Sequence, residues 1–146
     1  MPSTTDALIV LYVNTTDIIQ YSNSQKPQVL SCVYLADNQG DIDPADKTKF
    51  TAKLSGNSQI AWVGAVMNMA VDLLDYVLIN DITNISGGIP IQKRPKQNGS
   101  GDTHIDAFIT GNKPPSGSIT SYTLNFSVFV GGQEHVYSID PQLKMR

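Results

Sequence analysis

Two histidines, His104 and His135, are the side chains of this sequence best suited to acid–base catalysis. His104 has Asp102 and Asp106 close by, so a histidine–carboxylate pair can form there. The sequence around Ser116 lacks the glycine spacing of a turn that presents a serine nucleophile. We therefore expect His104 to lie on the solvated face of a strand end. We expect no catalytic residues and no enzyme activity.

Metal binding by nitrogen and sulfur ligands is the next chemistry to consider. One cysteine, two histidines and four methionines supply the ligand types of a blue-copper site. Such sites take their cysteine from a loop near the C-terminus, whereas Cys32 lies in the middle of an expected early strand, between Leu30 and Val33. We expect Cys32 to be a small buried residue. The paired cysteine or histidine spacing of zinc sites is missing, and a single cysteine allows no internal disulfide.

An acidic loop offers oxygen ligands of the kind that calcium prefers. Asp37, Asp41, Asp43 and Asp46 lie within ten residues, but their spacing does not match the EF-hand pattern. We therefore expect a solvated acidic loop, no metal site and no cofactor.

The charge distribution argues against nucleic acid as a partner. The formal net charge is −3, and a phosphate-binding face needs clustered lysine and arginine. The local basic cluster, Lys93, Arg94 and Lys96, lies in a stretch rich in proline and glycine, and we interpret it as a solvated loop. The glycine-containing segment 98–101 is followed by an expected strand, so it predicts a flexible loop, not a phosphate cradle.

Aromatic residues with polar tips could stack on sugars. Most of them occupy apolar positions of expected strands, which favours core packing, and Tyr21 is the best placed for ligand contact. The candidates are Trp62, Tyr12, Tyr21, Tyr34, Tyr76, Tyr122 and Tyr137. Asn-x-Ser/Thr triplets also recur, and we interpret them as chance in a chain rich in these residues; they begin at Asn14, Asn84, Asn98 and Asn125.

The elements that must position these residues are β-strands. The apolar run Ala7–Val13 is typical of a strand buried on both sides or in the middle of a sandwich. Phe50, Ala52 and Leu54 share one face of an alternating strand. In the strand 118–130, the even-numbered residues from Tyr122 share the apolar face. Further strands are expected at 29–35, 59–66, 104–110 and 134–139, with a last short segment at 142–145.

The stretch Val66–Ile79 fits two structures. Its apolar residues have helical spacing, yet the residues from Leu74 to Ile82 are rich in β-branched side chains. We expect a loop or short helical turn near Met67–Asp72, then a strand over Leu74–Ile82. About eight strands separated by turn signals predict an all-β chain. The expected fold is an antiparallel β-sandwich, jelly-roll or Ig-like, in a single domain over residues 1–146.

Length and charge point toward association. A chain of 146 residues suits one domain, and only 16% of the residues are charged, against about 25% in typical globular domains. Weak charge repulsion favours self-association. The start Met1–Asp6 lacks a basic leader, and no run approaches the roughly 18 apolar residues of a membrane span. We expect a cytoplasmic protein without a membrane span; leaderless export is the open alternative.

Several segments resemble the AidA/PixA family of bacterial inclusion-body proteins. The resemblance is carried by Thr5–Val13 with Thr16–Ile19, by Phe50–Leu54 with Ile60–Trp62, and by a final hairpin with Tyr122–Val128, Gly131-Gly132 and Tyr137–Pro141. Between Met67 and Lys96 the sequence departs from the family pattern. The resemblance implies a compact β-sandwich, intracellular inclusions and no known enzyme activity. It supplies no site residues.

Three functions remain in order of preference. The first is a non-enzymatic, self-assembling structural protein that acts through protein–protein contacts as a homo-oligomer or larger assembly. The alternative is a lectin-like binding module that recognises glycans or a protein partner through its loops, whose ligand-binding residues the sequence does not identify. A small enzyme built around His104 ranks lowest.

Overall fold

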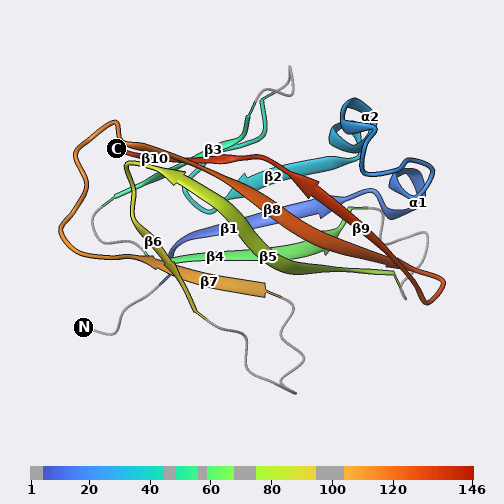
Figure 1. Cartoon of the computed structure of the whole chain (residues 1–146). Helices are drawn as coiled ribbons and strands as arrows, with labels where there is room; N and C mark the ends of the chain where they lie inside the picture. Colours follow the sequence, from blue (N-terminus) through green and yellow to red (C-terminus); the bar gives the residue numbers. More distant parts are fainter. Residues whose placement is uncertain (1–4, 45–48, 56–58, 68–74, 95–103) are drawn as a thin grey trace.

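The structure is a computed structural model, and it describes residues 5–44, 49–55, 59–67, 75–94 and 104–146. Most of the described chain is β-strand, which confirms the expected mainly β class. Ten strands and two short helices follow one another in this part of the chain (Figure 1): β1 (Thr5–Val13), α1 (Thr15–Ile18), α2 (Lys26–Ser31), β2 (Val33–Asp37), β3 (Thr51–Leu54), β4 (Gln59–Val66), β5 (Tyr76–Gly87), β6 (Ile91–Lys93), β7 (His104–Ile109), β8 (Ile119–Val130), β9 (Gln133–Ile139) and β10 (Gln142–Met145).

The strands form two mixed sheets. The first sheet has the order β2-β1-β4-β7-β6, and the second has the order β3-β10-β8-β5, with β9 also paired to β8. Two pairs are parallel, β1 with β4 and β10 with β3. The expectation of a purely antiparallel fold with about eight strands was therefore wrong. The reason is the chain path: after β2 the chain enters the second sheet as β3 and returns as β4 beside β1, in the same direction.

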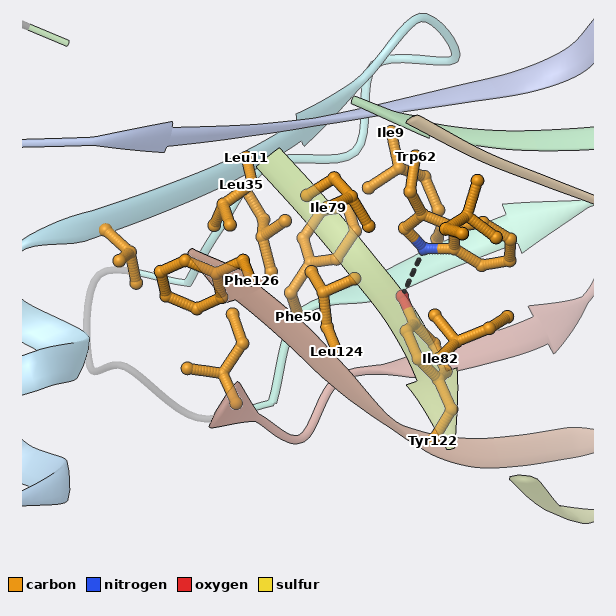
Figure 2. Packing of buried hydrophobic residues seen from close by; sticks show 14 of the residues in the cluster. Ile9, Leu11, Leu35, Phe50, Trp62, Ile79, Ile82, Tyr122, Leu124 and Phe126 are labelled. Carbon is orange, nitrogen blue, oxygen red and sulfur yellow. Dashed lines mark hydrogen bonds between the residues drawn. The ribbon is translucent and has the colours of Figure 1, made fainter. Parts of the chain in front are cut away.

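One hydrophobic cluster lies between the two sheets (Figure 2). Its largest fully buried side chains include Trp62 from the first sheet and Phe126 from the second. The Trp62 indole N–H donates a hydrogen bond of 3.0 Å to the hydroxyl oxygen of Tyr122, and the two rings meet edge to face with centroids 5.5 Å apart. This bond gives the only tryptophan a polar partner inside the core.

The predicted buried faces are confirmed for the strands in which apolar and polar residues alternate most clearly. Phe50, Ala52 and Leu54 are buried, whereas Lys53 on the opposite face is exposed. Along β8 the even-numbered residues from Tyr122 to Val128 are buried in the core. Alternation of residue type along a strand was therefore a sufficient guide to which side faces the other sheet.

The expected strand over residues 29–35 was wrong in its first half. Residues 26–31 form α2, with Pro27 in its first turn, and Val29 is fully buried. Proline is well suited to a helix start, because its missing N–H is one that has no intrahelical partner. A second unexpected helix, α1, begins after Asn14, whose side-chain oxygen accepts the N–H of Asp17 at 3.2 Å.

The strand expected from Leu74 begins at Tyr76 in the described chain. Of the turn predicted near Met67–Asp72, only Met67 is among the described residues. Strand β5 continues past Ile82 to Gly87, with register shifts along its pairing to β8. Gln92 and Lys93, expected to begin a flexible loop or hairpin connection over residues 92–102, belong instead to the short edge strand β6 beside β7.

Candidate functional site

The first sheet presents an apolar surface on the side that faces away from the core. Along β1, the residues Ala7, Ile9, Leu11 and Val13 point into the core and are at most 1% exposed. The intervening residues therefore point outward, and they are also apolar: Leu8 and Val10 are half-buried, and Tyr12 is 36% exposed.

Strands β2 and β4 extend this surface on either side of β1. The register places Tyr12 between Tyr34 and Ala65, and Val10 between Ala36 and Val63, while Leu8 pairs with Ala61. We call these eight outward residues the apolar face: Leu8, Val10, Tyr12, Tyr34, Ala36, Ala61, Val63 and Ala65. Ala61 is buried at 6% exposure, Tyr12 is exposed, and the other six are half-buried.

No described element covers the apolar face. The second sheet packs on the opposite side of the first, and α1 and α2 lie at one end of the two sheets (Figure 1). In two-layer folds, residues along a strand usually alternate between apolar ones that face the core and polar ones that face solvent. A contiguous, uncharged apolar row on the outer side of three strands is therefore unusual. Contiguous exposed apolar surface marks contact sites on soluble proteins.

Polar residues border the apolar face along β7. His104 is in register with Val63, and Asp106 with Ala61. Further along the same strand, the guanidinium of Arg94 lies 4.9 Å from the centre of the Phe108 ring. The surface therefore has an apolar centre with a polar border along β7, and a polar rim beside an apolar centre is the usual anatomy of a protein–protein interface.

The outer face of the second sheet is different in kind. Asn80 donates a hydrogen bond of 2.7 Å to the Ser127 hydroxyl, which donates one of 2.6 Å to Glu134. Asn125 likewise donates to the Thr83 hydroxyl at 2.9 Å. These polar groups satisfy one another. Apolar side chains also reach this face: Tyr76, stacked on Phe129, and Val136 are exposed toward one end of the sheet, and Ile119 is exposed at the start of β8.

The structure brings together one part of the sequence-predicted catalytic group. The Nε2 atom of His104 lies 3.3 Å from Oδ2 of Asp106, and both side chains are about two-fifths exposed, at 40% and 42%. His104 forms no hydrogen bond to a described serine, threonine or cysteine, and Asp102 lies outside the described residues. The expected position of His104, at a strand end on the solvated face, is the one it occupies.

The acidic loop was expected to be solvated, but its carboxylates accept hydrogen bonds from backbone N–H groups. Asp37 Oδ1 accepts the N–H groups of Gln39 and Asp41, each at 2.9 Å. Asp41 Oδ2 accepts the N–H of Lys53 at 2.9 Å, which attaches the loop to β3. Asp43 accepts the N–H of Leu35 at 3.3 Å. The carboxylates therefore hold the loop to the strands around it.

Two of these carboxyl groups lie against each other, which shifts their titration in opposite directions. Burial raises the pKa of Asp37, and the neighbouring Asp41 side chain raises it further. Burial alone would raise the pKa of Asp41, but the Lys53 N–H and the Asp37 side chain together bring that pKa below its usual value. Asp46, the fourth acidic residue, lies outside the described residues.

The cysteine and histidines considered for copper do not come together among the described residues. Cys32 follows α2 and is 5% exposed inside the core cluster, not in the middle of a strand as expected. Burial raises the pKa of its thiol. Over the ranges that the structure describes, no three His, Cys, Asp or Glu side chains are grouped in a way that could hold a metal ion.

The aromatic candidates for sugar stacking divide into two groups. Trp62, Tyr122 and Tyr137 are buried, at 2% exposure or less, so they serve the core. Tyr21, the expected contact residue, packs partly against the core, and its carbonyl accepts the Tyr137 hydroxyl at 3.0 Å. It therefore anchors the segment after α1. The exposed aromatic candidates among the described residues are Tyr12, on the apolar face, and Tyr76.

The basic cluster is only in part the solvated loop that was expected. The Lys93 ammonium group donates to Asp81 Oδ1 at 2.8 Å and to the Ile82 carbonyl at 2.9 Å, which connects β6 to β5 across the two sheets. Arg94 lies over Phe108, and Lys96 lies outside the described residues.

Sequence reasoning missed the apolar face for a specific reason. The apolar run of β1 was interpreted as a strand buried on both sides or in the middle of a sandwich. Apolarity alone does not distinguish a strand covered by a third layer from one whose outer side is left open.

The fold is similar to that of a protein of known structure. The crystal structure of the inclusion body protein PixA from Burkholderia cenocepacia matches with a TM-score of 0.57 and 14% sequence identity, over 99% of this chain and 98% of that chain. No protein-family model matches the sequence, and no curated protein matches it. None of the described helices is long and apolar enough to span a membrane. At this identity the match concerns the fold, which is the one that the resemblance to the AidA/PixA family implies.

Proposed function

We propose that this chain is a self-assembling structural protein of the inclusion-body type, which acts through contacts between copies of itself. The observation that carries the proposal is the apolar face, eight outward side chains over β2, β1 and β4 without a charge among them. Transferring such a surface from water to a protein contact is favourable.

The size of the apolar face indicates how strong the contact should be. Three strands about 4.8 Å apart and five residues of about 3.3 Å rise give roughly 250 Å² in projection. A stable interface buries about 800 Å² on each partner. The apolar face therefore forms the centre of a contact whose rim comes from residues such as His104 and Asp106, and we expect association to depend on concentration.

Low charge supports a second copy as the partner. With 16% charged residues and a net charge of −3, copies of the chain repel one another weakly. The same apolar face on both copies is self-complementary in chemistry, as an isologous contact requires.

The fold similarity supports the kind of assembly. The matched protein is described as an inclusion body protein, and this chain has its fold over nearly the whole length. By extension, we propose membership of the AidA/PixA family, a single domain over residues 1–146, no enzyme activity, and a cytoplasmic location in inclusions.

Glycan binding, the lectin-like alternative, has less support. Three of the seven aromatic candidates are in the core, and Tyr21 packs against it. The acidic residues that could hold a bridging calcium ion are used in backbone hydrogen bonds.

The test is the particle mass measured by size-exclusion chromatography with light scattering over a dilution series, with and without EDTA. The proposal expects oligomers or larger particles that grow with concentration and survive EDTA. A monomer at every concentration would refute self-assembly and would direct the search to glycan arrays. Assembly lost in EDTA would instead assign the contact to a bound cation.

A further inference from the structure

A half-open cavity of about 180 Å³ lies where the edges of the two sheets meet, away from the apolar face. Its walls come from four parts of the chain: α2, β2, the residues before β3, and the junction of β9 and β10. The apolar wall residues are Leu30, Val33, Leu35, Phe50, Ile139 and Pro141.

The volume and lining of the cavity fit one compact apolar group. An apolar cavity of about 150 Å³ lined by similar side chains stays dry and binds benzene. Val33, Leu35, Phe50 and Ile139 are at most 4% exposed, so they belong to the core and form fixed walls. A ring-sized group could enter without displacing the core.

Charged groups at the rim decide what such a ligand should carry. The ammonium group of Lys26 is already occupied, since it donates to Asn23 Oδ1 at 2.8 Å and to the Ser138 carbonyl at 2.6 Å. Asp43 accepts the N–H of Leu35, and Asp140 accepts the Thr123 hydroxyl at 2.9 Å.

Lys49 is the remaining charged residue of the lining. It is exposed, adjacent in sequence to the wall residue Phe50, and forms no ion pair with a described residue. A cation without an ion pair among the described residues, beside an apolar cavity, is complementary to an anionic group attached to an apolar one.

We propose that this cavity binds a small carboxylate with an aromatic ring or a similar compact apolar group, with the ring against Leu30 and Phe50 and the carboxylate at Lys49. The proposal is independent of self-assembly, since the cavity and the apolar face share no residue.

The test uses 3-phenylpropanoate and, as a neutral match, 3-phenylpropanamide, followed by ligand-observed saturation-transfer NMR, which works for monomers and large particles alike. We expect saturable binding of both, with the carboxylate about three- to fivefold tighter, as an exposed ion pair allows. Lys49→Gln should lower the affinity for the carboxylate to that for the amide. Lys113→Gln, at an exposed lysine that does not line the cavity, should leave both affinities unchanged.

A second variant tests the cavity itself. Leu30→Trp places a larger side chain in the wall at a half-buried position and should abolish binding of both probes, with circular dichroism checking that the fold is kept. The proposal is overturned if neither probe saturates up to about 10 mM, a limit beyond which binding is too weak to matter. Equal affinity for carboxylate and amide, or unchanged binding in a folded Leu30→Trp variant, would overturn it too.

Discussion

The Tyr122→Phe substitution removes the hydroxyl oxygen that accepts the indole N–H of Trp62. Both side chains are buried, with Trp62 at 0% and Tyr122 at 2% exposure, and the bond measures 3.0 Å. Burial in this apolar setting raises the pKa of the Tyr122 phenol far above its usual value, so the group is neutral at neutral pH. The substitution therefore changes one neutral hydrogen bond and little else.

The magnitude follows from what is left behind. Without the oxygen, a buried N–H has no acceptor, which costs about 1–3 kcal/mol. Removing the buried hydroxyl recovers part of that cost, because the phenol no longer has to be desolvated. We therefore expect a loss of about 1.5 kcal/mol in the free energy of unfolding. At roughly 3–4 °C per kcal/mol for a chain of this size, Tm should fall by about 5 °C.

Trp62 is itself the reporter. As the only tryptophan and fully buried, it should show a red shift in fluorescence on unfolding in urea. The variants are compared at one low protein concentration, because association would add stability. Tyr76→Phe is the matched control: Tyr76 is 48% exposed and contributes a stacked ring rather than a core hydrogen bond, so its loss should stay within about 0.5 kcal/mol.

Equal stability of Tyr122→Phe and Tyr76→Phe would refute the reasoning. It would mean that the Trp62–Tyr122 hydrogen bond is replaced at no cost, which a dry core does not allow. A loss much greater than 3 kcal/mol would also contradict it, since that size indicates repacking of the core and not one lost bond.

Two further predictions concern the contact between the sheets and the acidic loop. Gly64→Ala should lower the free energy of unfolding in urea by about 1–3 kcal/mol, because the added Cβ would lie 2.6 Å from Val77 Cγ1 and 2.9 Å from the Val77 carbonyl oxygen. The control is Gly88→Ala, whose Cβ would lie 3.4 Å from the Ser118 side chain. Equal losses in the two variants would contradict this prediction. Asp37→Asn should raise the urea midpoint near pH 7 and lose that advantage toward about pH 4. A carboxyl with a raised folded pKa contributes stability below its unfolded pKa and loses it as pH rises through the folded pKa, and asparagine mimics the protonated form; an advantage that does not change with pH would contradict this.

The strands could be predicted from the sequence wherever residue type alternates. Phe50, Ala52 and Leu54 are one such set, and β8 is another, because a two-residue period separates core from solvent without knowledge of the partner strands. The two helices could also have been anticipated. Asn14 followed three residues later by Asp17 is a helix N-terminal signature, and Pro27 is well suited to the first turn of α2.

The pairing of strands could not be predicted in the same way. The parallel pairs β1–β4 and β10–β3 join segments far apart in the sequence, and the local residue pattern is the same for a parallel and an antiparallel neighbour. For the same reason the apolar face was not foreseen. Val10 and Val63 become neighbours only through that pairing, and their exposure depends on whether another layer covers them.

The cavity and the acidic loop show a second limit. Leu30 and Ile139 line one cavity although they are distant in the sequence, so its volume follows from packing and not from a motif. The four aspartates were visible as a cluster, but whether their oxygens face a cation or backbone N–H groups depends on the loop conformation.

The central claim is that copies of the chain associate through the apolar face, and a pair of matched substitutions tests it most directly. Val10→Lys places a charge at the centre of that face, between Ala36 and Val63. Val136→Lys makes the same change on the outer face of the second sheet, at a residue 58% exposed.

Sedimentation or light scattering at matched concentrations should show Val136→Lys associating as the wild type does. Val10→Lys should remain monomeric to at least about tenfold higher concentration, since burying an unpaired lysine costs more than about 1.4 kcal/mol. If a folded Val10→Lys protein assembles like the wild type, or if both variants dissociate alike, the apolar face is not the contact between copies.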